Sequence, residues 1–402
     1  MEKSKVKRMY CEENNAYDII KRISFPRLVG SAGERKARNI ISEELNKAGY
    51  DSIKREKFET GFYNLNFIRY LFLLTGILIV LLGILFYFNH LTTILLIFLI
   101  NIMIIKCHII SSSKEIKLSK NKFKRYETEN IYVNLRSKNS KAKVILLGHY
   151  DSKGQTFSIS LRKILFSNAI FGIIITMIIY IIFFSIKIFF NYIAFEFSLI
   201  LLIVCMIVGV ITIINFFNKT NNNSNGATDN GSSVGILIEL ARYFKKNPIN
   251  NLDIIFLFPS SEEINLGGSK IFLYTHKNEF NKADTYFINY DVIGTNGNLN
   301  LITNYGYLKK KVSSIKLKTL FFSAANELDI DIKSICSPFG IWSDYLSIVN
   351  HGFEACWLSS LTAFKKVHTL EDNIDLISKE AIKNVLNLSV NTIKKLDKNY
   401  GD

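Results

Sequence analysis

The chain has 402 residues, a length that suits one large domain or two to three smaller ones. Its hydrophobic fraction of 49% and mean hydropathy of +0.18 are too high for an ordinary soluble enzyme, so we expect membrane-spanning segments. The net charge of +16 would suit a nucleic-acid partner, but the sequence has no helix-turn-helix, zinc-knuckle or aromatic ribonucleoprotein pattern. We therefore expect no nucleic-acid partner and attribute the basic residues to membrane topology and anionic lipid.

Cysteine usage and the N-terminus indicate the compartment. The five cysteines form no Cys-x-x-Cys pair, so a disulfide framework is not expected and a reducing compartment is compatible. The basic residues 1–8 are not followed by an apolar core, which predicts no cleavable signal peptide.

The first sixty residues have the pattern of a soluble domain. Residues 12–22 and 33–48 predict amphipathic helices, and Gly49 is a natural stop for the second. Residues 51–60 are extended and polar, which is typical of a strand near a sheet edge.

Four apolar blocks then interrupt this pattern. Residues 67–88 and 91–110 are separated only by Asn89 and His90, and a second pair spans residues 164–184 and 197–217. A helix needs about 20 apolar residues to cross a bilayer. The alternative, a buried helical pair in a soluble core, fits two consecutive runs of this length poorly. We therefore predict two transmembrane helical hairpins, at residues 67–110 and 164–217.

Basic residues at the ends of these blocks predict orientation. Cytoplasmic flanks of membrane spans carry an excess of lysine and arginine. Here the opposite loops hold only Lys187. The flanks facing the soluble segments hold seven such residues: Arg69, Lys106, Lys114, Lys117, Arg162, Lys163 and Lys219. We expect a multi-pass integral membrane protein with four spans and a cytoplasmic soluble domain, assembled from residues 1–66, 111–163 and 218–402.

The soluble segments alternate strands and helices. Strands are predicted at residues 130–135, 143–147, 254–258 and 284–290 and near Leu299 and Phe353; helices are predicted at residues 232–246, 267–277, 309–328 and 378–396. Residues 254–258 are continuously apolar, as in parallel strands buried on both faces. This pattern predicts an α/β fold, in which ligands bind at the carboxyl ends of the strands.

Seven residues that can bind a metal or move a proton follow strands or precede helices: His149, Asp151, Asp229, Glu262, Glu263, Asp291 and His368. Each alone has an ordinary explanation. The two glutamates suit a solvated acidic turn, Asp229 suits a helix N-terminus, and His368 suits a loop. His149 is less easily explained, because a histidine at the end of a buried strand needs a partner, which Asp151 can supply.

The order of these residues resembles a known family. His-x-Asp, Asp-Asn-Gly at a helix start, Glu-Glu, Asp-x-Ile-Gly and a late His-Thr follow the pattern of the co-catalytic di-zinc aminopeptidases, metallopeptidase family twenty-eight. Bacterial leucyl aminopeptidases, glutamate carboxypeptidase and glutaminyl cyclase are relatives. The N-terminal residues 26–31 and the Ser343-Asp344 pair also look like this family, so the resemblance covers residues 18–391.

The resemblance implies a fold and a set of roles. It implies a zinc exopeptidase fold, with a central mixed, mostly parallel sheet flanked by helices. The two predicted hairpins that interrupt this fold are a departure from the family. The resemblance also implies two Zn²⁺ ions, replaceable by Co²⁺ or Mn²⁺: His149 and Asp291 on one, Glu263 and His368 on the other, with Asp229 bridging. Glu262 would be the general base, and Asp151 would support it in catalysis by orienting His149. The implied substrates are peptide or protein N-termini.

Two departures from the family pattern leave alternatives open. Tyr345 stands where the family usually has histidine, and Phe353 where it often has proline, which leaves substrate preference undecided. A glutaminyl cyclase-like or carboxypeptidase-like reaction would use the same ligands. A non-enzymatic membrane scaffold is the third possibility, although no ligand is missing. The oligomeric state cannot be read from the sequence.

Overall fold

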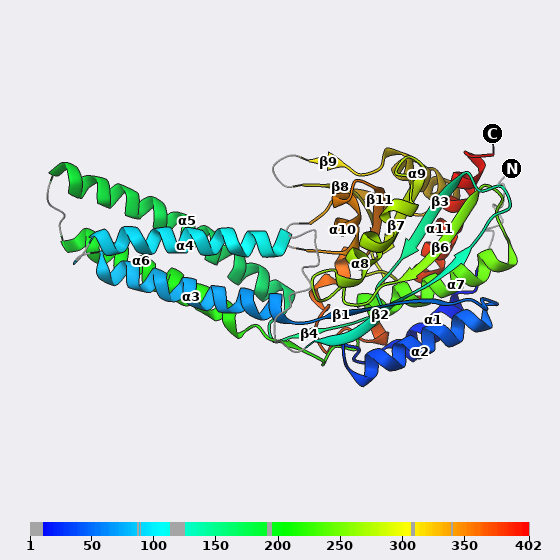
Figure 1. Cartoon of the computed structure of the whole chain (residues 1–402), viewed down its shortest axis with the longest axis horizontal. Coiled ribbons are helices and arrows are strands. Elements are labelled where there is room, and N and C mark those ends of the chain that lie inside the picture. The colour runs from blue at the N-terminus through cyan, green and yellow to red at the C-terminus, as the bar shows by residue number, and fades with distance from the viewer. Residues whose placement is uncertain are drawn as a thin grey trace, which may run out of the picture. The chain divides into compact units, whose positions relative to one another are not determined.

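The chain forms two compact units in a computed structural model that describes residues 11–86, 88, 90–112, 125–190, 195–306, 310–338 and 341–401 (Figure 1). Unit one comprises Met1–Gly61, Lys114–Gly154 and Asn221–Asp402, and unit two comprises Phe62–Ser113 and Gln155–Thr220. Unit one is therefore built from three stretches of chain, and unit two is inserted between them in two pieces.

Unit one contains a nine-stranded mixed sheet. Its strands are β1 (Lys54–Thr60), β2 (Tyr126–Leu135), β3 (Ala142–Leu147), β6 (Leu252–Phe258), β7 (Thr285–Tyr290), β8 (Leu299–Tyr305), β9 (Lys311–Val312), β10 (Ile332–Cys336) and β11 (Glu354–Ser359). They lie in the order β1-β2-β6-β3-β7-β11-β8-β10, and β9 pairs with β8. The predicted mixed α/β sheet is confirmed.

The parallel pairs gather at the centre of this sheet. Strands β6, β3, β7 and β11 are parallel to one another, and β10 is parallel to β8. The pairs β1–β2, β2–β6, β8–β11 and β8–β9 are antiparallel. The expectation of a mostly parallel sheet is therefore right for the centre, whereas the flanks mix the antiparallel pairs of β1, β2, β8 and β9 with the parallel pair β8–β10.

Helices cover both faces of the sheet. One face packs against α1 (Glu13–Ile23), α2 (Ala32–Lys47), α7 (Ser232–Lys246), α9 (Ile315–Leu328) and α11 (Lys379–Lys398). The other packs against α8 (Gly267–His276) and α10 (Asp344–Asn350). Strand β3 illustrates how both faces of the sheet are buried. Val144 and Leu146 lie in the core under α1, α2, α7, α9 and α11, and Ile145 and Leu147 lie in the core under α8 and α10. Buried on both faces, the central strands can offer polar residues only at their ends.

Four elements differ from the prediction. The helix expected from residue 309, which is outside the described residues, begins at Ile315, because Ser314 Oγ accepts a hydrogen bond from Leu317 N at 3.0 Å and caps it. Lys311–Val312 form β9 instead. Strand β10 and helix α10 were not predicted: β10 is short and only partly buried, and α10 has seven residues, too few for a clear helical period.

Unit two consists of apolar helices: α3 (Tyr63–Leu85), α4 (His90–Ser112), α5 (Ile159–Phe190) and α6 (Phe195–Ile214). All four contribute to one apolar core, through residues such as Ile79, Ile100, Ile173 and Leu201. Their outward faces are apolar too, as at Ile77, Phe98, Ile178 and Ile203. Soluble domains rarely expose apolar surface of this extent, so these faces suit lipid.

Three stretches in the described residues are long and apolar enough to cross a membrane: Tyr63–Leu85, Ile159–Phe190 and Phe195–Phe217. In α4, the described apolar stretch is the shorter Thr92–Met103. The side chains of residues 104 and 106–112 lie outside the description, and so do Lys114 and Lys117 of the orientation argument. The structure thus gives three candidate spans, and the prediction of two complete hairpins is not confirmed.

Candidate metal centre

His149 lies in the loop that leaves the central strand β3. Its ring is buried, and Nδ1 lies 3.1 Å from the backbone oxygen of Asp151. A carbonyl oxygen only accepts hydrogen bonds, so this contact places a proton on Nδ1. The other ring nitrogen, Nε2, is buried and makes no hydrogen bond to any described residue.

Asp229 lies in the short helical turn Ala227–Gly231 that precedes α7. The carboxylate of Asp372 accepts the backbone N–H groups of Thr228 at 2.7 Å and Asp229 at 3.2 Å. The amide of Asn230 donates to the backbone oxygen of Tyr290 at 2.9 Å. These bonds tie the turn to the carboxyl end of β7, where Asp291 follows.

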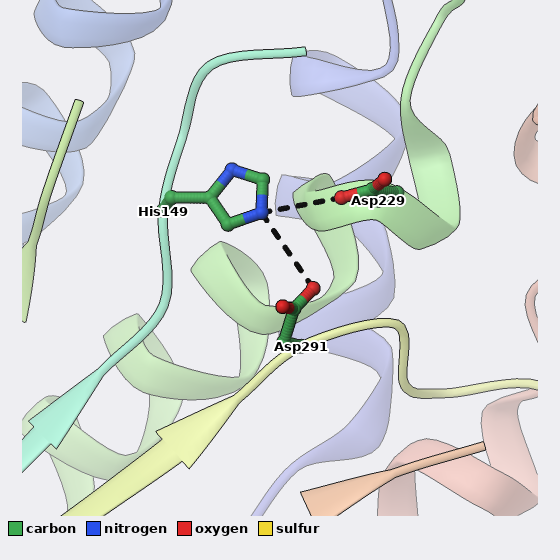
Figure 2. A group of neighbouring side chains, drawn as sticks. All are labelled: His149, Asp229 and Asp291. Atoms are coloured by element: carbon green, nitrogen blue, oxygen red, sulfur yellow. Dashed lines mark ion pairs between the residues drawn. The ribbon is translucent and has the colours of Figure 1, made fainter. Parts of the chain in front are cut away.

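The first group of potential ligands is His149, Asp229 and Asp291 (Figure 2). His149 Nε2 lies 3.2 Å from Asp229 Oδ1 and 3.6 Å from Asp291 Oδ1. The three side chains come from the loop after β3, the turn before α7 and the end of β7, and they point toward one another. Adjacent parallel strands bring these positions together because their carboxyl ends share one edge of the sheet.

The second group is Asp229, Glu263 and His368. His368 Nε2 lies 3.1 Å from Asp229 Oδ2 and 3.0 Å from Glu263 Oε1. Asp229 therefore belongs to both groups, with one carboxylate oxygen directed to each. This is the arrangement that a carboxylate bridging two metal ions would need.

The Glu262–Glu263 pair is held in place by Asp151. The two carboxylate oxygens of Asp151 accept hydrogen bonds from the backbone N–H groups of Glu262 at 3.2 Å and Glu263 at 3.3 Å. The same carboxylate lies 3.5 Å from His149 Nδ1, so it also contributes to the environment of that ring. Glu262 belongs to neither group, but its Oε2 lies 3.7 Å from His149 Nε2.

The centre is buried and rich in negative charge. Burial raises the pKa of Glu262 well above its usual value; His149 opposes this shift, and the fields of Glu263, Asp291 and Asp344 add to it. Burial also raises the pKa of Asp344 to about 7. Buried carboxylates at this density are stable only when they are protonated or compensated by cations.

The side chains present fit a metal site. Two three-residue groups of imidazole and carboxylate donors match the donor atoms that Zn²⁺ takes in proteins. The buried Nε2 of His149, with no hydrogen bond from the described residues, is the atom that such an ion would bind. The hydrogen bond at Nδ1 fixes the ring in the tautomer that binding through Nε2 requires.

Three residues near the centre have backbone conformations that are unusual for side chains other than glycine. Ser261, Val292 and His368 have φ values of 62°, 54° and 64°. Each lies at or next to a proposed ligand or base. Such left-handed residues cost of order 1–3 kcal/mol and gather at functional sites.

Several charged residues at the centre were not found from the sequence. Lys153 Nζ lies 2.7 Å from Glu263 Oε2, and Arg27, Asp344 and Asp372 are fully buried. Lys153 follows His149 by four residues, and Asp372 follows His368 by four, so adjacency to a ligand was an available signal. Arg27 and Asp344 lie in the two further segments that resemble the family, which was the available signal for them. In contrast, Tyr345 and Phe353, which left substrate preference open, lie in the hydrophobic core under α8 and α10.

Comparisons with known proteins agree with this geometry. Residues 211–393 match the model of peptidase family M28. A vacuolar membrane protease of Schizosaccharomyces pombe is 27% identical over 176 residues, which are 42% of this chain and 20% of that protein. A vacuolar membrane protease of Vanderwaltozyma polyspora is 28% identical over 191 residues, 42% of this chain and 18% of that protein. The chain thus matches about a fifth of the length of these relatives.

Solved structures share the fold. A zinc aminopeptidase from Bacillus subtilis has a TM-score of 0.57 at 15% identity, with 97% of this chain and 96% of that chain covered. An aminopeptidase from Aneurinibacillus sp. strain AM-1 has a TM-score of 0.56 at 13% identity, covering 96% and 94%. A glutaminyl cyclase from an Acidobacteriales bacterium has a TM-score of 0.55 at 14% identity, covering 99% of both chains.

Proposed function

Because residues 211–393 match the model of peptidase family M28, we propose that this chain is a zinc-dependent membrane-bound aminopeptidase that hydrolyses the N-terminal bond of peptides or proteins. The observation that carries this proposal is Asp229, whose two carboxylate oxygens face two separate histidine-containing groups. A site for a pair of metal ions needs such a shared ligand.

The proposed ligands divide between two zinc ions. His149 and Asp291 would hold one ion, Glu263 and His368 the other, and Asp229 would bind both; Co²⁺ or Mn²⁺ could replace zinc. When bound, the metal pair supplies Lewis-acid polarisation of the scissile carbonyl and a water of lowered pKa.

The chain's own residues would then orient groups and move a proton. Glu262 Oε2, which faces the first ligand group, would accept a proton from the attacking water and return it to the leaving nitrogen. Burial favours this role, because a carboxylate with a raised pKa holds the proton between the two steps. Asp151 would hold Glu262, Glu263 and His149 in position through the contacts of its carboxylate described above.

The connectivity of unit one supports four membrane spans. Strand β1 precedes the first insertion, β2 lies between the insertions and β6 follows the second, yet β1 pairs with β2 and β2 with β6. Paired strands lie about 4.8 Å apart, so they cannot stand on opposite sides of a hydrocarbon layer about 30 Å thick. Each insertion must cross the membrane an even number of times. If α3 spans the bilayer, α4 must return across it. The basic flanks favour the cytoplasm as the side we propose for unit one.

Metal content and substrate preference together test the proposed activity. Purified, detergent-solubilised protein should contain about two zinc ions per chain. It should release the first residue from free aminoacyl amides, lose activity with a chelator and leave N-acetylated substrates intact. A peptide beginning with glutamine should be shortened. Loss of ammonia from this peptide without shortening would instead establish a cyclase. Cleavage of N-terminally blocked peptides at their carboxyl end would establish a carboxypeptidase. Absence of metal from active-site-intact protein would favour a scaffold.

A further inference from the structure

Arg27 is a buried cation that binds backbone instead of carboxylates. Its side chain is fully buried, and within the described part of the chain it forms no salt bridge. The guanidinium donates hydrogen bonds to five backbone oxygens: Nε to Tyr150 at 2.7 Å, Nη1 to Ile23 at 2.6 Å, Phe25 at 2.9 Å and Asn225 at 2.6 Å, and Nη2 to Gly226 at 2.8 Å. All three nitrogens of the planar fork therefore have backbone acceptors, and Nη1 shares its two hydrogens among three of them.

Two of these contacts reach the loops that carry proposed ligands. Tyr150 lies between His149 and Asp151, and Gly226 directly precedes the turn that carries Asp229. Arg27 therefore contacts two of the three segments that supply the first ligand group, the His149 loop and the Asp229 loop. Nothing in the reaction described above uses this residue.

These two loops are also the places where the chain leaves unit one and returns to it. Residues 155–220 belong to unit two, so the loops are separated in sequence by an insertion of apolar helices. Further hydrogen bonds join the two loops to each other and to the Arg27 segment. Arg27 N donates to Ser152 Oγ at 3.0 Å, and Ser152 Oγ donates to the backbone oxygen of Ser224 at 3.3 Å. Leu28 N donates to Asn222 Oδ1 at 2.8 Å. The fit is tight, since a Cβ on Gly226 would lie 2.5 Å from Ser152 Cβ and 2.9 Å from Arg27 Nη2.

We propose that Arg27 is a positioning residue of the metal centre, which clamps the His149 loop to the Asp229 loop across the point where the apolar helices α5 and α6 are inserted. The inference rests on the proposed function in taking His149 and Asp229 as ligands. A long insertion between two ligand loops frees their ends, and the loops must meet within a few tenths of an ångström to bind metal. Five backbone hydrogen bonds from one rigid group restore that precision.

The clamp is tested with Arg27→Met, which keeps an unbranched apolar stem as far as the position of Nε and removes the guanidinium fork, and with Arg27→Lys. Arg242→Met is the matched control, because it removes ion pairs to Glu44 and Glu239 in the same unit, without contact to either loop. Hydrogen–deuterium exchange is followed in metal-free protein. We expect faster exchange at residues 149–152 and 224–230 in Arg27→Met, a smaller increase in Arg27→Lys, and none in Arg242→Met.

Metal binding gives a second readout. Arg27→Met should weaken Zn²⁺ affinity by roughly tenfold or more, the range typical of residues that orient ligands. It should also change the visible spectrum of the Co²⁺-substituted protein, which reports ligand geometry. If Arg27→Met does not fold, Ser152→Ala and Asn222→Ala remove single bonds of the same clamp and should raise exchange in the same segments.

The outcomes separate the clamp from the proposed activity. Lower overall stability with unchanged loop exchange, Zn²⁺ affinity and Co²⁺ spectrum would make Arg27 a merely structural residue and overturn the inference. Wild-type protein that binds two metal ions but cleaves no peptide would refute the aminopeptidase and leave the clamp standing. Wild-type protein that binds no metal would refute the metal centre, and loop exchange would still decide the clamp.

Discussion

Asp229 and Glu262 face the same small volume, yet their surroundings assign them different tasks. Both oxygens of Asp229 lie within 3.2 Å of a histidine nitrogen, so its carboxylate is committed to ligand contacts. Glu262 has only the longer 3.7 Å approach to His149 and a pKa raised chiefly by burial. A carboxylate without a ligand role can exchange a proton during a reaction.

Substitution separates these two roles. Glu262→Gln should keep the metal content of the wild type and lower kcat by about 10²–10⁴-fold, because it removes the proton acceptor and little else. Asp229→Asn should lose both metal and activity. Metal analysis and steady-state kinetics on the same preparations check this, with Glu239→Gln as a buried glutamate remote from the centre. Near-normal turnover in metal-replete Glu262→Gln would rule out Glu262 as the base.

The sequence was informative about residues that follow strands, and much less so about residues that act over long sequence separations. His149, Glu262, Glu263 and Asp291 were found because each ends an apolar run. Arg27 lies in a segment that resembles the family, but its contacts could not be predicted, because its partners at Tyr150 and Gly226 are backbone atoms 123 and 199 residues away.

Glycines set how closely α3 and α6 pack. A Cβ on Gly76 would lie 2.7 Å from the backbone oxygen of Gly209, and a Cβ on Gly209 would lie 2.9 Å from that of Gly76. The two backbones therefore approach where no side chain separates them. Helices in a lipid environment associate through such small residues, because apolar burial gives little advantage there.

Enlarging one of these glycines should destabilise unit two. Gly209→Leu forces the helices apart, and we expect the free energy of unfolding to fall by about 1–3 kcal/mol. Thermal unfolding in detergent measures the change. Val210→Leu, on the outward face of the same helix, adds bulk without a neighbour to displace and should unfold like the wild type. Equal stability of the two variants would mean that α3 and α6 do not rely on this contact.

Among the helices and strands, those whose apolar residues follow one clear pattern along the sequence were predicted. Elements that are short or only partly buried were not. Strand β6 was expected at residues 254–258 and extends from Leu252 to Phe258. Strand β10 escaped notice because its residues 332–336 alternate only weakly between buried and exposed. The antiparallel flanks of the sheet were missed for another reason: strand direction depends on partners far away in the chain, as in β2 beside β6.

The even number of crossings makes a prediction for the whole molecule. In a cysteine-free background, Phe88→Cys and Phe190→Cys mark the ends of α3 and α5, and Lys138→Cys marks an exposed loop of unit one. With four spans and cytoplasmic unit one, a membrane-impermeant maleimide should label the first two in intact cells and label Lys138→Cys only after lysis. Labelling of Lys138→Cys in intact cells would show that the proposed orientation is reversed. Labelling of only one of the two tips would show that the other pair of helices does not form a transmembrane hairpin.

The interleaving of the two units also fixes the order in which this protein can mature. The last apolar stretch ends at Phe217, and Asp229, Glu263, Asp291 and His368 are all translated after it. A ribosome therefore translates all the described apolar helices before it makes four of the five proposed ligands. A nascent chain that stalls before residue 368 lacks part of the proposed ligand set, so under the proposed function a complete metal centre would form only after the apolar helices have been made.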